Sequence, residues 1–352
     1  GLWKTTDGGQ NWVTNTDFIA LVGCSDVAID PHNPQIMYLA TGDANGMTSQ
    51  LTLTSIGILK STDGGQTWPT NSNTMNWQVS WGRNIYKLLI HPAHPDTVFA
   101  ATTVGIYRTV DAGLHWNTVQ SGIFSDIEFK PGNPNILYAT AGVFSGGTFY
   151  KSVDGGSTFT PGTNGLPPST DVARLEIEVT PADTNYIYLV AVKKNTNDFY
   201  GFYRSIDGGD QFTLQANTPN ILTGNAGSQA SYNLCMAVSS LHKDTILVGA
   251  TNIWRSYDSG VTWTKQTSET GGFIPYVHPD HHAIVYYPGT DSIYFSGNDG
   301  GIFKTLDRGT SWSTLNDGLQ IAQMYKFGIS PLNPNTILTG HQDMGTQQYE
   351  NG

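Results

Sequence analysis

The chain repeats one short turn motif seven times, and this repetition constrains its fold more than any other feature. Each copy reads Ser or Thr, any residue, Asp, any residue, Gly, two further residues, and then Trp or Phe. Successive aspartates lie 56, 48, 43, 53, 51 and 49 residues apart. Such a period indicates an array of similar units, although a length of 352 residues would ordinarily favour two domains. The seven aspartates are Asp7, Asp63, Asp111, Asp154, Asp207, Asp258 and Asp307.

The motif has the chemistry of a tight hairpin turn. Its glycine can adopt a positive φ, its aspartate can accept hydrogen bonds from the N–H groups of the turn, and its aromatic residue can pack on a sheet. A second turn alternates with it, for example 30–34 or 130–134, and lies between apolar runs such as 27–29 and 36–40. Each unit therefore predicts four antiparallel strands, A to D, with the second turn between A and B and the aspartate motif between C and D.

Four-stranded units repeated at this period predict an all-β protein, a seven-bladed β-propeller with four-stranded blades and a single domain over residues 1–352. The chain starts with a C–D hairpin and ends with an A–B hairpin, so we expect these two hairpins to pair and close the ring. In the alternative, the chain is a fragment of a larger multidomain protein with a second propeller. Residues 345–352 would then compete with residues 1–5 for one strand position.

The repeated octet is the Asp-box, and over residues 1 to about 344 the chain resembles the Asp-box (BNR) propellers. These include sialidases, sortilin-type receptors, two-propeller xyloglucanases and uncharacterised secreted bacterial repeat proteins. The resemblance implies a secreted or cell-surface location and a structural role for the seven aspartates. Function is then expected on loops at one end of the channel, where a rigid scaffold presents variable segments.

Composition excludes several classes of partner. The net charge is −11 and the chain has no run of Lys or Arg, which argues against nucleic acid and anionic lipid. No stretch of about 18 apolar residues occurs, so we expect no membrane insertion. Cys24 and Cys235 lie in different repeats, where a disulfide between them is not expected, and their redox state stays open. We expect no cofactor.

The strand order places the D–A and B–C connections on one face, here called the top face, opposite the aspartate motifs. Three polar segments, 278–282, 298–299 and 341–343, are expected to converge in one sector of that face. Their histidines and aspartates could supply an acid and a base or tie loops together, and their spacing is weak evidence for a metal, which we do not predict. The candidates are Asp280, His281, His282, Asp299, His341 and Asp343.

Aromatic residues of the top-face connections are a second candidate feature. Trp77, Trp81 and Tyr232, with Arg83 nearby, could stack on sugar rings. Packing in the core is the alternative for each of the three rings.

The resemblance suggests two kinds of enzyme, of which one is excluded. Sialidases need three arginines for a carboxylate, whereas four of the six arginines here lie beside Asp-boxes, only Arg83 and Arg174 could reach the top face, and the Arg-Ile-Pro signature is absent. Xyloglucanases use two aspartates across a cleft between two propellers. Asp299, in Asn-Asp-Gly-Gly-Ile-Phe, lies in a context similar to their Asp-Ile-Gly-Gly segment, and Asp43 and Asp280 are weaker candidates.

We therefore expect a binding or interaction module that recognises a glycan or a protein through its top-face loops. The alternative is a xyloglucanase-like glycoside hydrolase, or one propeller of a two-propeller enzyme. A structural component of a surface assembly is a second alternative.

Overall fold

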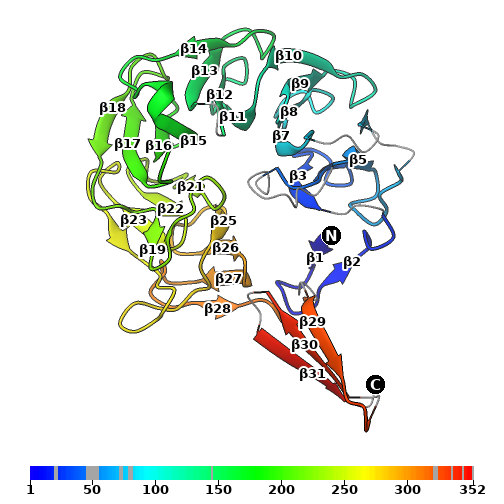
Figure 1. The fold of residues 1–352 in the computed structure, drawn as a ribbon. Helices are drawn as coiled ribbons and strands as arrows, with labels where there is room; N and C mark the ends of the chain where they lie inside the picture. Colours follow the sequence, from blue (N-terminus) through cyan, green and yellow to red (C-terminus); the bar gives the residue numbers. More distant parts are fainter. Residues whose placement is uncertain are drawn as a thin grey trace.

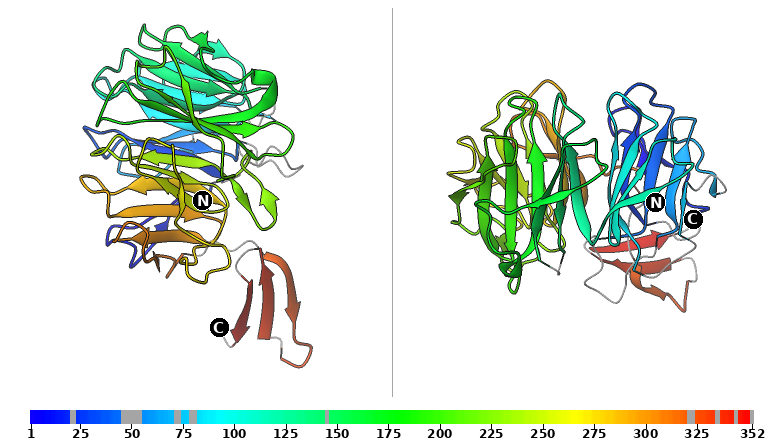
Figure 2. Two further views of the ribbon diagram at one scale, coloured as in Figure 1. Left: turned by 90° about the vertical axis from the view of Figure 1, so that its left-hand side faces the viewer. Right: turned by 90° about the horizontal axis from the view of Figure 1, so that it is seen from above.

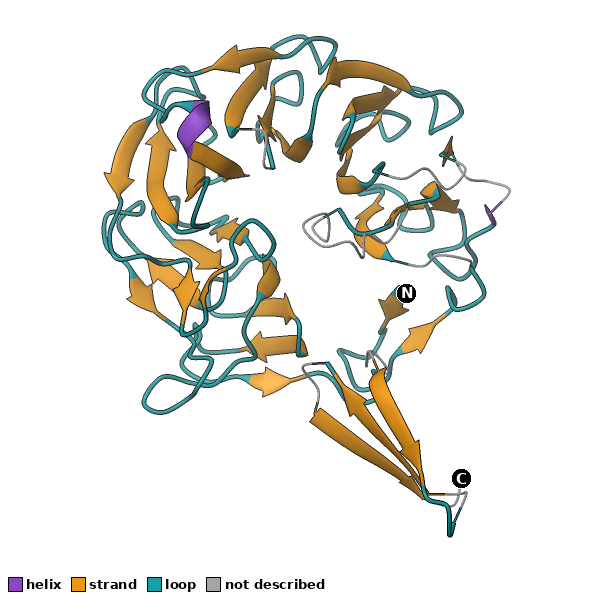
Figure 3. Ribbon diagram, in the orientation of Figure 1, coloured by secondary structure: helices purple, strands orange, loops and turns teal. Residues whose placement is uncertain are grey.

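The structure is a computed structural model that describes residues 1–19, 23–44, 55–70, 74–77, 82–143, 146–319, 324–333, 336–342 and 345–350. Six four-stranded antiparallel sheets are arranged around a central channel as the blades of a propeller (Figure 1). Strands and loops make up nearly all of the fold, with a short 3-10 helix at Ser169–Asp171 (Figure 3). The all-β propeller predicted from the repeat is thus confirmed.

The six blades follow one another along the chain, each with strands in the order A, B, C, D from the channel outward. Blade 1 comprises β3 (Cys24–Ile29), β4 (Met37–Thr41), β5 (Gly57–Ser61) and β6 (Met75–Asn76); blade 2 comprises β7 (Ile85–Ile90), β8 (Val98–Thr102), β9 (Gly105–Thr109) and β10 (Asn117–Ser121); blade 3 comprises β11 (Phe124–Phe129), β12 (Leu137–Ala141), β13 (Thr148–Ser152) and β14 (Thr160–Gly162). Blade 4 comprises β15 (Val172–Val179), β16 (Ile187–Lys193), β17 (Phe199–Ser205) and β18 (Thr213–Ala216); blade 5 comprises β21 (Cys235–Val238), β22 (Ile246–Gly249), β23 (Ile253–Ser256) and β24 (Thr264–Lys265); blade 6 comprises β25 (His281–Tyr286), β26 (Tyr294–Asn298), β27 (Gly301–Thr305) and β28 (Ser313–Thr314). A small hairpin of β19 (Thr223–Gly224) and β20 (Gly227–Ser228) precedes blade 5.

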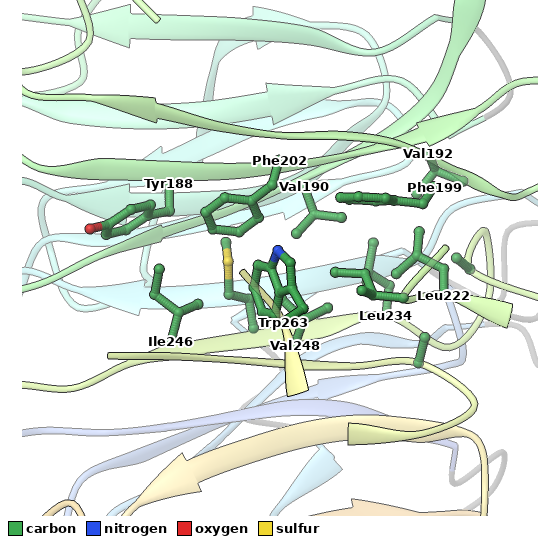
Figure 4. Packing of buried hydrophobic residues seen from close by; sticks show 14 of the residues in the cluster. Tyr188, Val190, Val192, Phe199, Phe202, Leu222, Leu234, Ile246, Val248 and Trp263 are labelled. Atoms are coloured by element: carbon green, nitrogen blue, oxygen red, sulfur yellow. The ribbon is translucent and has the colours of Figure 1, made fainter. Parts of the chain in front are cut away.

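Burial follows strand position within each blade. The B strands β4 and β8 are buried along their whole length because neighbouring blades cover both faces, and their sequences are continuous apolar runs. The outer D strands β10 and β18 are largely exposed and polar. The core therefore consists of layers between adjacent blades, and Figure 4 shows one layer, where Tyr188 and Phe202 of blade 4 face Trp263 of blade 5.

The aspartate turns share a set of hydrogen bonds among the Ser or Thr hydroxyl, the aspartate and the N–H of the second glycine position. In blade 3, Ser152 Oγ donates to Asp154 Oδ1 over 2.8 Å and accepts the N–H of Gly156 over 3.0 Å. Asp154 Oδ1 also accepts the N–H groups of Ser157 and Thr158. The Thr158 side chain and these N–H groups stabilise the carboxylate and lower the pKa of Asp154 to about 2. The carboxylates are thus engaged within their own turns.

The prediction of seven blades in a ring closed by the two terminal hairpins was wrong. The first hairpin, β1 (Trp3–Lys4) and β2 (Val13–Thr14), forms a sheet of its own. The last hairpin, β29 (Met324–Ile329) and β30 (Thr336–His341), pairs instead with β31 (Gly345–Glu350). The resulting three-stranded sheet projects away from the ring (Figures 1 and 2).

Pairing length and chain connectivity explain this outcome. Strand β31 pairs with β30 at six consecutive positions, whereas β1 is only two residues long. A hairpin partner joined by a short loop also costs less closure entropy than one more than 300 residues away. The competition between residues 345–352 and residues 1–5 is therefore resolved in favour of the local strand.

The N-terminal hairpin still joins the first and last blades. Trp12 Nε1 donates to the carbonyl oxygen of Leu315 over 2.8 Å, on the blade 6 side. Lys4 Nζ donates to the carbonyl oxygen of Gly64 over 2.7 Å, in the aspartate turn of blade 1. Both cysteines are free thiols, and within the described residues no helix is long and apolar enough to cross a membrane.

Candidate functional site

A histidine and an aspartate of blade 6 meet at the top-face end of the channel. The ladder between β25 and β26 shifts register between His281 and Ala283, and this irregularity places His282 outside the regular alternation of the strand. His282 Nε2 lies 2.8 Å from Asp299 Oδ1, just beyond the end of β26, and each side chain keeps roughly a quarter of its surface exposed, 29% and 23%. The sequence prediction that these two segments converge is confirmed for this pair.

The loop that enters blade 5 adds an aromatic ring and an amide to the pair. The Tyr232 and His282 rings meet edge to face, with centroids 4.8 Å apart and planes at 81°. Asn233 Nδ2 donates to Asp280 Oδ1. Burial, and then the charge of Asp299, raise the pKa of Asp280. Two neighbouring carboxyl groups therefore lie in different environments at one point of the rim.

His281 has a structural role. Its side chain is fully buried, and its Nδ1 lies 2.6 Å from Ser296 Oγ on the facing strand. Burial lowers the pKa of His281 to about 3, so this imidazole stays neutral at ordinary pH. The prediction that His281 contacts a ligand is corrected, because a buried neutral ring that pairs with a serine is not accessible.

A belt of charged residues lines the channel below this rim, around a cavity of about 320 Å³ to which His282 contributes. In blades 1 to 4 a charged residue follows the bulge of strand A and reaches the next blade. Lys87 Nζ contacts Asp126 Oδ1 at 2.7 Å, and Arg174 donates to the carbonyl oxygen of Leu234 at 3.0 Å. The four belt residues are Asp26, Lys87, Asp126 and Arg174.

Arg174 connects the belt to the rim. Its Nη1 donates to the Tyr232 carbonyl oxygen over 3.3 Å, and its Nη2 bonds to Glu176 Oε2 over 2.8 Å. Burial raises the pKa of Glu176 to about 7, against the lowering effect of Arg174. Burial also raises the pKa values of Glu128 and Glu178, which face Lys87. Burial in the channel therefore favours the protonated form of these three carboxyl groups.

Sequence reasoning noted that Arg174 could reach the top face but missed this belt. The available signal was the charged residues at alternate positions of an otherwise apolar strand, 172–179, because in a buried innermost strand such charges must face the channel.

The other predicted candidates lie apart from the pair. Trp77 is 8% exposed and packs edge-on against Tyr107, so the core-packing alternative holds and its face is unavailable to a sugar. Arg83 is exposed in the connection that precedes blade 2. His341 lies on β30 in the projecting sheet, where its Nε2 contacts Thr339 Oγ1, and so does not join His282 and Asp299.

Three candidates remain. Asp43 follows β4 as Asp299 follows β26, and its charge acts on Tyr86 of the channel wall. Trp81 and Asp343 lie outside the described residues. Among the residues that the structure describes, no group of three or more His, Cys, Asp or Glu side chains is arranged to hold a metal ion.

Comparison with known proteins gives sequence relatives of one kind. No protein-family model matches the chain. The chain is 25% identical over 319 residues to a xyloglucanase of Paenibacillus sp, covering 75% of this chain and 29% of the relative. It is 24% identical to xyloglucanase Xgh74A of Acetivibrio thermocellus, covering 75% of this chain and 35% of the relative. The chain thus spans about a third of the length of these curated relatives.

Solved structures support the fold. A GH74 enzyme of Niastella koreensis superposes with a TM-score of 0.70 at 20% identity, covering 99% of this chain and 55% of the enzyme. The GH74 xyloglucanase of Xanthomonas campestris gives 0.72 at 16% identity, covering 98% of this chain and 55% of the enzyme. YCF48 from Cyanidioschyzon merolae gives 0.54 at 12% identity and covers 93% of this chain and 95% of its own. At these identities the superpositions establish the β-propeller fold.

Proposed function

We propose that this chain is a glycoside hydrolase-like propeller that binds a xyloglucan-type glycan at the top-face rim of its channel. The similarity to xyloglucanases over three quarters of the chain carries the proposal. The paired His282 and Asp299, with Tyr232 beside them, supply a fitting chemistry: a carboxylate, a proton carrier and an aromatic ring for a sugar.

In this proposal the two carboxyl groups of the rim have different roles. Asp280 is the proton donor, because burial and the neighbouring Asp299 favour its protonated form. Asp299 is its partner, oriented by the hydrogen bond from His282. Asp43 follows strand β4 of blade 1, on another side of the rim, and is the alternative to Asp280 as the partner of Asp299.

The proposal extends to the parent protein. The aspartate turns are Asp-boxes in the sense of the secreted repeat propellers, and the protein acts outside the cell. The projecting sheet β29–β31 has three strands in the order of A, B and C and begins a further blade. This chain then supplies one propeller of a two-propeller enzyme, and a second propeller supplies the opposite wall of the glycan cleft.

Release of reducing sugar from xyloglucan, measured together with retention on immobilised xyloglucan, tests the proposal. We expect Asp299→Asn to reduce release at least a hundredfold while retention persists, and His282→Ala to reduce both. The matched control is Asp171→Asn, a carboxylate of the top face that precedes β15. Absence of both release and retention for the unmodified chain would overturn the proposal, whereas retention without release would reduce it to glycan binding.

Protein binding is a second candidate. YCF48 bound to D1 peptide superposes with a TM-score of 0.55, and the alignment covers 94% of both chains, so a single propeller of this size is sufficient for a peptide complex in that protein. This second candidate would be favoured if the chain bound no glycan but bound a peptide saturably, and if Tyr232→Ala weakened the peptide binding.

A further inference from the structure

The interface between blades 5 and 6 contains a second cavity, far from the rim and on the face of the aspartate turns. Its volume is about 280 Å³, just below the usual range of small-molecule pockets, about 300 to 1,000 Å³. Three tyrosines line it, Tyr257, Tyr286 and Tyr294, together with His242, Thr245, Arg255, Asp291 and Arg308. None of them takes part in the function proposed above, and this inference does not rest on it.

The preceding interface, between blades 4 and 5, shows what occupies the corresponding space. The strand registers make Tyr186 and Thr245 equivalent, since each directly precedes the first residue of strand B, Ile187 or Ile246. The Tyr186 ring lies against the guanidinium group of Arg204, 5.6 Å away, and against Lys243 Nζ, 4.2 Å away. A phenol ring thus fills the space between two blades.

The Tyr186 ring has no counterpart at the next interface, where only part of its surroundings recurs. Tyr257 and Tyr286 stand there in the places of Ile206 and Val238. Arg255 takes the place of Arg204, and the pair His242–Asp291, at 2.5 Å, takes the place of the pair Asp183–Lys243, at 3.0 Å. Thr245, however, has no aromatic ring that could lie between Arg255 and this pair. The cavity therefore corresponds to the volume that the preceding blade fills with tyrosine.

Two further features equip this cavity to bind. The Tyr294 hydroxyl, on a residue 1% exposed that lines the cavity, has no hydrogen-bond partner among the described residues, which is costly for a buried polar group. Arg308 has a φ of 60° at a position that is glycine in four of the seven turns. Ala112 and Ser259 adopt the same conformation in their own turns, so the feature particular to this blade is the Arg308 side chain, which lines the cavity.

We propose that this interblade cavity binds a hydroxylated six-membered ring, either a phenol or a pyranose. The exposed Tyr257 ring, which already covers Arg255 at 4.7 Å, provides an aromatic wall. Arg255, His242 and Asp291 provide donors and acceptors for ring hydroxyl groups. The proposal names a site on the face opposite the rim, and its ligand binds independently of any glycan in the channel.

Binding measured by calorimetry and saturation-transfer NMR on the full chain tests this proposal. The probes are p-cresol, methyl β-D-xylopyranoside and, as an apolar compound without a ring, N-acetyl-leucinamide. We expect saturable binding at one site for p-cresol or the xyloside and none for N-acetyl-leucinamide. Binding of p-cresol alone assigns a phenol, and binding of the xyloside alone assigns a pyranose.

The decisive variant is Thr245→Tyr, which restores the ring of the preceding blade. It should weaken binding at least tenfold without lowering the melting temperature. Thr245→Val keeps the cavity and should bind the probes as tightly as the unmodified chain does. If Thr245→Tyr does not fold, Arg308→Gly replaces it, with the same tenfold loss expected, since glycine is the residue of four other turns. Absence of saturable binding by both ring probes, or equal binding by both cavity variants and the parent, would overturn the proposal.

Discussion

At the scale of residues, the unusual feature is a group of ionisable side chains inside an apolar scaffold. Arg174 and Glu176 lie on one strand of blade 4 and bond to each other, and the arginine also bonds to backbone oxygens of the next blade. A buried arginine needs such partners because an unpaired charge in the interior is very costly. The channel charges therefore join blades, and their protonation is coupled to stability.

This coupling predicts a dependence of stability on pH. Burial raises the pKa of Glu176 from its ordinary value, near 4.5, to about 7, while Lys87, Asp126 and Arg174 act on it from the channel. The folded chain then binds this proton more tightly than the unfolded chain does. Stability from this group is fully present below about pH 4.5 and is lost as the pH rises through about 7.

Urea unfolding of the parent and of Glu176→Gln, at intervals from pH 5 to pH 8, measures the effect. The parent should lose on the order of 2 kcal/mol more than the variant over this range. Glu128 and Glu178 titrate in both proteins, so their contribution cancels in the comparison. Parallel pH profiles would show that the Glu176 carboxyl group is not perturbed by its surroundings.

At the scale of elements, the second position of the B strand is a tyrosine in three blades, and its ring lies where one blade meets the next. Tyr38, Tyr138 and Tyr188 stand at equivalent positions, each paired across the sheet with the lysine or arginine that precedes an aspartate turn. The hydroxyl of Tyr188 donates to the Lys243 carbonyl oxygen over 2.8 Å, and that of Tyr138 has no partner among the described residues.

The two tyrosines form a matched test of the interblade hydrogen bond. Tyr188→Phe should lower the free energy of unfolding by about 1 kcal/mol, because it leaves the carbonyl oxygen of a buried interface without its donor. Tyr138→Phe removes a hydroxyl with no bond and should be neutral or slightly stabilising. Chemical denaturation of both variants measures the effect. Equal losses of unfolding free energy would mean that the tyrosine ring, and not its hydroxyl group, stabilises the interface.

At the scale of the whole molecule, six blades and the N-terminal hairpin form the ring, and the last three strands stand apart from it (Figure 2). Phe327, Ile329 and Leu338 of this sheet are about half exposed or more. The hairpin, by contrast, is bonded to blade 6 through Trp12 and to blade 1 through Lys4. The N-terminal hairpin is therefore part of the ring, whereas the C-terminal sheet projects from it.

Truncation after Leu319 tests this division. Loss of the projecting sheet should change the melting temperature of the ring by less than about 2 °C, because few contacts join the two. Deletion of residues 1–19 should lower it by several degrees, since the bonds between the first and last blades are lost. A large fall on C-terminal truncation would mean that the sheet supports the ring.

The local sequence determined the repeating unit. Turn chemistry, the spacing of the seven aspartates and the apolar B strands predicted antiparallel four-stranded blades, because each of these signals acts within a few residues. It also predicted the meeting of His282 and Asp299, since both lie at fixed positions of one blade. Only the tertiary structure decided the number of blades, because β1 and β31 are both suited to the edge of β30 and their competition depends on pairing length and loop closure. Burial was decided in the same way: Trp77 and His281 are enclosed by neighbouring blades, and the cavity beside Thr245 exists because of what two blades leave unfilled between them.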